Sequence, residues 1–394
     1  MPAPALVPSA ASTPPMALPP PRWIVSARYD GWFFFASALL AVGAGTLAIW
    51  QPAAILPLWF GWIWLIEGPH LFATWQRTYF DPEYRRQHAR LLTTSLFWLT
   101  PGVLCWLLAQ VSGRGEVFLL FLGAATLWSF HHAIRQYYGV QSLYQRLRQS
   151  ELRARQQDKV LLHSSLWLAY AVFLLAHPAN RAQLGLSAHR VVLDEMLLPT
   201  LIAVLVLAPL LWCSLLLLRW RQKLALLPGL FGLLVAGGTT FFSLFVVGSR
   251  EPLLANAATP EQVFMATTIV TGGLHGIHYL GMVVAASGRR AATPPMTTGL
   301  PPSTTLAQRL GRQPWLAYGV LLALSVLYVA LNLLRGGAPV NLGSSLNWAP
   351  DSAVTQGFLA VYWGLFFHHY WLDQHIWKPS KDAQLRHELN LGSL

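Results

Sequence analysis

Charged residues are scarce in this chain. They make up 11% of its 394 residues, while hydrophobic residues make up 54%. A typical soluble domain carries roughly 25% charged residues. So few charges exclude a soluble domain of useful size, and the lipid bilayer must be the main solvent of this protein.

Cysteine is also nearly absent. The only two, Cys105 and Cys213, fall inside apolar runs, where a thiol behaves as a small hydrophobe. This placement excludes a disulfide framework and says nothing about the redox compartment.

The first 29 residues lack a long apolar run and are rich in proline, alanine and serine, which is typical of a disordered tail. The first apolar run begins near Trp32 and has no small-residue cleavage pattern near its end. We therefore expect a retained first helix rather than a cleaved signal peptide.

Long uncharged runs follow one another along the rest of the chain. Spanning helices need about 20 apolar residues, and ten runs meet this need: 30–50, 54–76, 91–111, 116–139, 160–177, 198–218, 225–247, 263–287, 315–334 and 354–377. The sequence therefore predicts an all-α, polytopic membrane helix bundle of about ten transmembrane helices. It would cover 30–378, between a Pro-rich cytoplasmic tail, 1–29, and a second cytoplasmic tail, 379–394.

The basic residues predict the orientation. With the N-terminus inside, all but five of the 27 Lys and Arg residues fall in cytoplasmic segments, as the positive-inside rule requires. The net charge of +12 then reflects topology, and no nucleic-acid partner is expected. We expect both termini in the cytoplasm of a multi-pass protein, in a membrane such as the bacterial inner (plasma) membrane.

Polar side chains gather on four of the ten runs, and all four are even-numbered. Polar groups within spanning helices are expensive and usually mark a functional site. Here they are Glu67 and His70 on the second run, His131 and His132 on the fourth, His275 and His278 on the eighth, and His368, His369 and Asp373 on the tenth.

These sets lie at similar depths. His70 precedes the basic residue Arg77 by seven positions, and His369 precedes Lys378 by nine, or roughly 10–14 Å at 1.5 Å per residue. Because even runs share one direction, the sets can form a single layer in the cytoplasmic leaflet.

Imidazole and carboxylate groups without thiolate suit a transition metal. Carboxylate–histidine sets from several helices build the di-iron sites of helix bundles. We expect iron, as one ion or a di-iron pair, with zinc, copper and manganese left open. The candidate ligands are Glu67, His70, His131, His132, His275, His278, His368, His369 and Asp373. Adjacent histidines point about 100° apart on a helix, so one of each pair would serve outside the ligand shell.

Two further residues are candidate catalytic groups. Arg135 follows His131 by four positions and could bind a carboxylate or phosphate of a lipid-like substrate, or serve only as an interfacial anchor. Tyr279 follows His275 by four and could orient a ligand or belong to the aromatic belt.

The His131-His132, His275-Gly276-Ile277-His278 and His368-His369 motifs near cytoplasmic helix ends resemble, at scattered positions, those of the histidine-rich integral-membrane di-iron oxygenases. These include fatty acid desaturases and hydroxylases and the Brp/Blh-type carotenoid cleavage enzymes. The desaturase boxes HxxHH and HxxxH do not occur here. The resemblance therefore implies only a chemical idea, an oxygen-activating metal centre that opens to a lipophilic substrate.

The sequence predicts a membrane-embedded, metal-dependent oxidoreductase of oxygenase, hydroxylase or desaturase type. Its partners would be the bilayer, a hydrophobic small-molecule substrate and an electron-donor protein. Two alternatives stay open: a proton- or metal-coupled transporter, and a membrane subunit that binds haem through two histidines.

Overall fold

The computed structural model describes residues 23–176, 192–248, 260–292, 305–334, 352–389 and 391. The predicted all-helical fold is confirmed, since the described residues form helices and no strand. Eight helical segments are long and apolar enough to cross a membrane. They are Ala27–Trp50, Ala89–Ser112, Glu116–Leu147, Leu152–Ala176, Leu193–Arg221, Leu227–Gly248, Met265–Ala292 and Pro314–Leu334.

Three of these segments combine shorter elements. The first consists of α1 (Ala27–Asp30), the π-helix η1 (Gly31–Ala36) and α2 (Ser37–Trp50). The second consists of α6 (Ala89–Ser95), η4 (Leu96–Leu99) and α7 (Pro101–Ser112). A π-helix, η6 (Leu193–Leu197), precedes α12 (Leu198–Arg221). The remaining segments are α8 (Glu116–Leu147), α9 (Leu152–Ala176), α13 (Leu227–Gly248), α14 (Pro260–Ala292) and α16 (Pro314–Leu334).

The second and tenth predicted spans are helical too, but they are not among the eight. After the short η2 (Pro52–Ala54), the second is continuous through α3 (Ile55–Trp62), η3 (Ile63–Glu67) and α4 (Gly68–Arg77). The tenth is α17 (Ala353–Ile376). Both have the length of a span, but the polar side chains of the predicted site make them less apolar than the eight.

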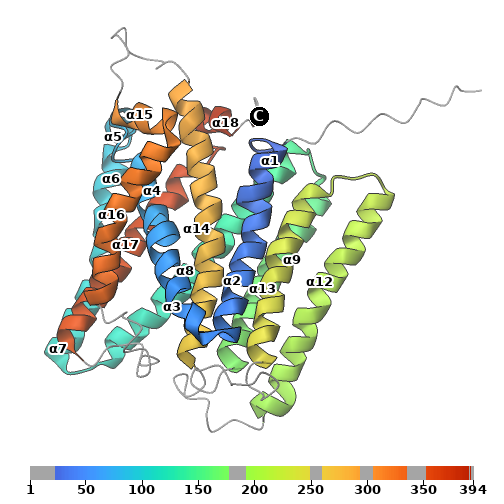
Figure 1. Ribbon diagram of the computed structural model, residues 1–394, viewed down its shortest axis with the longest axis horizontal. Coiled ribbons are helices and arrows are strands. Elements are labelled where there is room, and N and C mark those ends of the chain that lie inside the picture. The colour runs from blue at the N-terminus through green and yellow to red at the C-terminus, as the bar shows by residue number, and fades with distance from the viewer. Residues whose placement is uncertain are drawn as a thin grey trace, which may run out of the picture.

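The long helices run side by side (Figure 1). The long helix α14 packs against α2, α3, α4 and α8, and α17 packs against α4, α7, α8 and α16. Helix α12 lies at one edge of the bundle on α9 and α13 (Figure 1). Helices α4 and α8 therefore each contact both α14 and α17, so the four helices that carry the predicted polar sets lie together.

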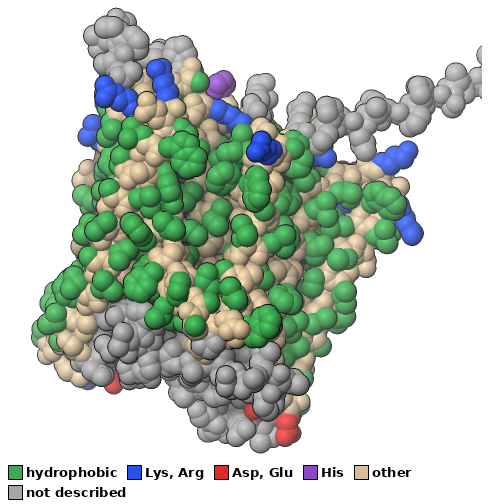
Figure 2. Space-filling model, viewed as in Figure 1, with side chains coloured by type: hydrophobic (Ala, Val, Ile, Leu, Met, Phe, Trp, Pro, Cys, Tyr) green, Lys and Arg blue, Asp and Glu red, His purple; other side chains and the backbone are tan. Residues whose placement is uncertain are grey.

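Charge separates the two ends of the bundle. On the face drawn in Figure 2, Lys and Arg side chains gather at one end, acidic side chains lie at the other, and hydrophobic side chains cover the band between them. Figure 1 places α1 and α18 (Ala383–Glu388) at the same, basic end. This arrangement is that of a protein whose middle lies in a bilayer.

Short helices cover the basic end. They are α5 (Pro82–Gln87), α15 (Leu306–Arg312) and α18. Glu388 of α18 pairs with Arg77 of α4 at 2.8 Å and with Arg290 of α14 at 3.4 Å, and Arg290 also pairs with Asp81 at 2.7 Å. We call α5, α15 and α18 the cap. These ion pairs link it to α4 and α14, two of the helices that carry the predicted site.

The packed part of the chain begins before the predicted bundle. Ile24 is buried, and its N–H donates to Asp30 at 2.7 Å. Residues 1–22, most of the predicted disordered tail, lie outside the described residues. At the other end, α18 and Leu389 of the predicted tail pack on the bundle.

Candidate metal centre

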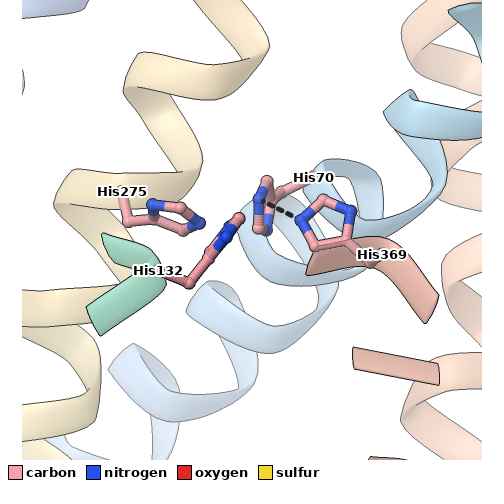
Figure 3. Close-up of side chains that lie close together, drawn as sticks. All are labelled: His70, His132, His275 and His369. Atoms are coloured by element: carbon pink, nitrogen blue, oxygen red, sulfur yellow. Dashed lines mark hydrogen bonds between the residues drawn. The ribbon is translucent and has the colours of Figure 1, made fainter. Parts of the chain in front are cut away.

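Four histidines from four helices converge inside the bundle. His70 of α4, His132 of α8, His275 of α14 and His369 of α17 each offer a ring nitrogen, and these atoms lie within 4.8 Å of one another. All four side chains are buried. Figure 3 shows the rings turned toward a common centre, with His132 and His275 facing His70 and His369. We call this set the four-histidine group.

The rings are packed edge to face. The centroid of His70 lies 4.5 Å from that of His275 and 4.5 Å from that of His369, with interplanar angles of 84° and 85°. The Nε2 atoms of His70 and His369 are 3.0 Å apart. Two neighbouring ligands of an octahedral metal ion, with metal–nitrogen bonds of about 2.1 Å, would also be roughly 3.0 Å apart.

Local backbone structure presents His70 to the group. Residues Ile63–Glu67 form a π-helix directly before it, a feature often found at functional sites. Pro69 has no N–H for the carbonyl four residues earlier, and that carbonyl, of Leu65, instead accepts a 2.6 Å hydrogen bond from Tyr318. Tyr318 of α16 thus gives the carbonyl of Leu65 a hydrogen-bond donor. The side chain of His70 projects from the first turn of α4, just after the π-helix.

Glycines allow α14 to approach this turn closely. A Cβ atom built on Gly276 would lie 2.6 Å from Ile66 Cγ2 and 3.6 Å from His70 Cβ. A Cβ atom on Gly272 would lie 2.6 Å from the ring of Trp62. His275 can therefore meet His70 only because α14 has no side chain at these positions.

A second ring of polar groups surrounds the histidines. Thr74 Oγ1 lies 2.7 Å from His369 Nδ1 and 2.6 Å from the hydroxyl of Tyr279, and it donates to Asp373 at 3.1 Å. Tyr279 donates to Asp373 Oδ1 at 2.6 Å. Glu67 Oε1 faces His70 Nδ1 at 3.7 Å. His70 and His369 thus turn Nε2 to the group and Nδ1 to an outer oxygen, as metal-bound histidines do.

The other oxygen of Asp373 lies at the edge of the group. Its Oδ2 is 3.3 Å from His369 Nε2 and 3.6 Å from His132 Nε2. One carboxylate oxygen therefore belongs to the outer hydrogen bonds and the other is within reach of the centre. Asp373 could add a fifth ligand to the four imidazoles.

Hydrogen bonding within the protein does not satisfy this arrangement. Among the described residues, His70 Nδ1, His132 Nε2 and both ring nitrogens of His275 are buried without a hydrogen-bond partner. A buried polar atom without a partner costs roughly 1–3 kcal/mol. A cation bound by Nε2 of His70 and His369 would leave both Nδ1–H groups free to donate outward, to Glu67 and Thr74.

Three of the predicted ligands point elsewhere. His131 is exposed, and its ring stacks near Trp167. His278 is buried, but its Nε2 lies 3.1 Å from the carbonyl of Phe34. His368 Nε2 lies 2.9 Å from the hydroxyl of Tyr79, on which its ring stacks. His131 and His368 lie outside the four-histidine group, as expected for one member of an adjacent pair. His278 follows His275 by three positions and was predicted to bind beside it, but the group does not include it.

The two predicted catalytic residues, Arg135 and Tyr279, both line a cleft between α8, α14 and the end of α17. Tyr279 is buried against the group, with its ring centroid 4.8 Å from that of His70. Arg135 is exposed and lines the cleft beside His131 and His132. Glu67 is buried with Oε2 unpartnered among the described residues.

Thr74 and Gln136 contact the site but were not among the predicted site residues. Gln136 donates to the carbonyl of His275 at 2.7 Å. A sequence signal for both exists: each histidine of the group is followed four positions later by a polar side chain on the same helix face, and these are Thr74, Gln136, Tyr279 and Asp373.

Four imidazoles with a neighbouring carboxylate make a nitrogen–oxygen donor set without sulfur. Such a set suits iron, manganese, copper or zinc. The four buried histidines are close enough to hold one such ion.

Comparison with known proteins gives no relative for this chain: no family model, no curated protein and no solved structure matches it. The resemblance to histidine-rich membrane oxygenases is therefore untested by these comparisons, and function must be argued from the site itself.

Proposed function

We propose that this protein holds one transition metal ion, iron, on its four-histidine group and acts as a membrane-embedded oxidoreductase on a hydrophobic substrate. The observation that carries the proposal is the convergence of four buried imidazoles from four separate helices within 4.8 Å. Each of the four helices must be placed and rotated so that its histidine points to the same centre, and this is improbable for a chance cluster.

A purely structural polar cluster would be built differently. Interhelical hydrogen bonds in membranes pair each donor with an acceptor, yet four ring nitrogens of the group have no partner among the described residues. The oxygens of Thr74 and Glu67 face Nδ1 of His369 and His70, where hydrogen-bond acceptors for metal-bound imidazoles lie. A cation at the centre would take His132 Nε2 and one ring nitrogen of His275 as ligands, and it would leave His70 Nδ1 turned outward to Glu67.

The number of ligands favours one metal ion over two. Four histidines and Asp373 give at most five ligands in the described site, whereas a di-iron centre shares more carboxylates. An ion with six positions would keep at least one open for dioxygen or substrate. That position can face the cleft, because His132 and Asp373 line both the group and the cleft.

Oxidation of a C–H bond is the reaction that this arrangement suits. In a hydroxylation, one atom of dioxygen enters the substrate and the other leaves as water, with two electrons and two protons supplied by a reductant. The metal would supply dioxygen binding and activation. The buried network of Tyr279, Thr74 and Asp373 would hold protons next to the centre, and an electron-donor protein would deliver the electrons.

Transport is less well supported by the described residues. A carrier needs polar groups that continue across the membrane. On the side of the group away from the basic end, the described core is the aromatic and aliphatic cluster that includes Trp59, Trp62 and Phe118. Haem is less suitable as well, because the two further imidazoles would occupy the plane of a porphyrin held by the first two.

For the topology we propose ten spans, with the basic end in the cytoplasm. The ten are the eight apolar segments together with the segment Ile55–Arg77 and α17, whose polar groups are buried in protein instead of facing lipid. Reporter fusions after Arg77 and after Gln222 should report the cytoplasmic side. The bacterial inner membrane stays a prediction.

The metal proposal is tested by elemental analysis of the detergent-purified protein from metal-replete cells. We expect about one equivalent of metal in the wild type and less than a tenth of it in His70→Ala and His275→Ala. His278→Ala is the matched control, because it removes a buried imidazole from α14 outside the group. Equal metal content in all four proteins would overturn the site.

The redox proposal is tested in membranes. Dioxygen consumption with a chemical reductant should depend on His275, and mass spectrometry of the lipid extract should find a product with one added oxygen or two fewer hydrogens. A protein that holds metal but neither consumes dioxygen nor changes any lipid would not be an oxidoreductase of this type.

A further inference from the structure

A cleft of about 490 Å³ leads from the basic end of the bundle to the four-histidine group. Its walls come from α8, α14 and the end of α17 with the turn that follows. At one place it is lined by His132, Tyr279 and Asp373, and elsewhere by three cations, Arg135, Arg146 and Lys378. The cleft therefore joins a positively charged surface to the proposed metal centre.

These three cations have no ion-pair partner in the part of the chain that the structure describes. Among the described residues, Arg135, Arg146 and Lys378 make no ion pair, and Nη1 of Arg146 is buried without a hydrogen-bond partner. Arg146 is partly buried, whereas Arg135 and Lys378 are exposed. The buried side chains of Arg77 and Arg219 pair with Glu388 and Asp158, each at 2.8 Å. The cleft therefore presents cationic side chains whose charge no ion pair among the described residues neutralises.

Acidic side chains do not neutralise the cleft. The only acidic residue in its lining is Asp373, and Oδ1 of that carboxylate already accepts hydrogen bonds from Thr74 and Tyr279. A ligand that carried a carboxylate or phosphate could take two charge-assisted hydrogen bonds from one guanidinium group of the cleft, which holds an oxyanion in a fork.

The remaining lining mixes polar groups such as Gln136, Ser142 and Gln374 with apolar ones. Aromatic and aliphatic side chains make up a large part of it: Trp128, Tyr138, Leu143, Met282 and Trp377. His132 and Arg146 lie 14 positions apart on α8, about 21 Å along the helix. A pocket of this volume suits one small or single-chain ligand.

We propose that the cleft binds a single-chain anionic amphiphile, with its oxyanion headgroup on the guanidinium of Arg135 or Arg146, its charge balanced by the cations that line the cleft, and its apolar chain against the aromatic lining. Its role as the substrate rests on the proposed function. Its binding does not, because none of the three cations belongs to the four-histidine group.

Binding is measured with a dansyl-labelled fatty acid on the full chain in detergent, and displaced with hexadecanoate, hexadecyl phosphate and hexadecanol. Loss of two charged hydrogen bonds should weaken binding of the probe by about tenfold or more in Arg135→Gln/Arg146→Gln. Arg153→Gln is the control, because Arg153 is exposed on α9 and does not line the cleft. It should bind as the wild type does.

The competitors decide the chemistry. Hexadecanol should displace the probe about tenfold more weakly than the better of the two anions, and the order of hexadecanoate and hexadecyl phosphate then tells a carboxylate site from a phosphate site. Equal displacement by the alcohol, or equal binding in the double variant and the control, would overturn the proposal.

The same variants separate this inference from the proposed function. Arg135→Gln/Arg146→Gln should keep its metal, and His275→Ala should lose metal yet still bind the probe within about threefold of wild type. A protein without metal that still prefers the anions would refute only the metal centre. A metal-loaded protein without that preference would refute only the amphiphile site.

Discussion

The close approach of α14 to the irregular turn before His70 makes Gly276→Ala a sharp perturbation of the site. The new methyl group would meet Ile66 Cγ2 at 2.6 Å, whereas methyl groups pack best at roughly 3.5–4.0 Å. Ile66 cannot easily turn away, because a β-branched side chain in a helix has one preferred rotamer. The helices must therefore separate by about 1 Å.

A separation of about 1 Å should lower the stability of the fold only modestly, but it should disturb the metal–ligand distances strongly. Overpacking of this kind costs roughly 1–3 kcal/mol of stability, which a bundle of this size should survive. Metal–ligand distances, in contrast, tolerate only about 0.2 Å, and the Cβ atom of His70 itself lies 3.6 Å from the new methyl group. We expect the affinity for metal to fall by at least about tenfold.

The assay is metal stoichiometry after dialysis against a graded series of chelator concentrations, with thermal unfolding in detergent as the check on folding. Gly273→Ala is the matched control on the same helix, because its methyl group would meet Ala41 Cβ at 3.6 Å, an ordinary contact. If Gly276→Ala holds metal as tightly as Gly273→Ala, the positions of His70 and His275 do not determine binding, and the reasoning is refuted.

Three further predictions concern a hydroxyl beside the site, an ion pair of the cap, and the ion pair between α9 and α12. Thr74→Val removes the hydroxyl beside His369 Nδ1 and should weaken metal binding by about 10–100-fold in a chelator titration, while Thr74→Ser should not; equal loss in both would contradict the role of the hydroxyl. Glu388→Gln leaves buried Arg77 without its carboxylate and should cost about 3–5 kcal/mol, seen as earlier proteolysis of α18. Asp158→Asn should destabilise the α9–α12 contact through Arg219 by a similar amount, which denaturation in detergent would measure; wild-type stability in either carboxylate variant would show that the pair is solvated.

Much of the fold could be predicted from the sequence because the bilayer imposes a simple rule on span length and polarity. The uncharged runs at 116–139 and 225–247 became α8 and α13. The rule is weakest where function adds polar groups: the Ile55–Arg77 segment and α17 carry the site and are absent from the eight apolar segments. The polar residues that indicate the site therefore also lower the hydropathy by which these two spans would be recognised.

The candidate site was predictable as a set of residues but not as a geometry. Depth along a helix follows from counting, so His70, His132, His275 and His369 could be placed in one layer. The direction in which each ring points depends on helix rotation, which one sequence does not fix. This is why the sequence could not show that His278, three positions after His275, points to the carbonyl of Phe34 and not to the four-histidine group.

Local irregularity was the second obstacle. A proline inside a helix, such as Pro69, predicts a kink, but it does not predict the π-helix over Ile63–Glu67, whose extra residue rotates the side chains that follow it. The partner that makes this tolerable, Tyr318, comes from a distant helix and carried no sequence signal of its own.

X-ray absorption spectroscopy of the purified, metal-loaded protein tests the central claim most directly. A first shell of nitrogen and oxygen at about 2.0–2.2 Å, with the multiple-scattering pattern of about four imidazoles that falls to three in His132→Ala reconstituted with excess metal, is the result we predict. A shell with fewer than three imidazoles in the wild type, or one unchanged by His132→Ala, would contradict the four-histidine centre.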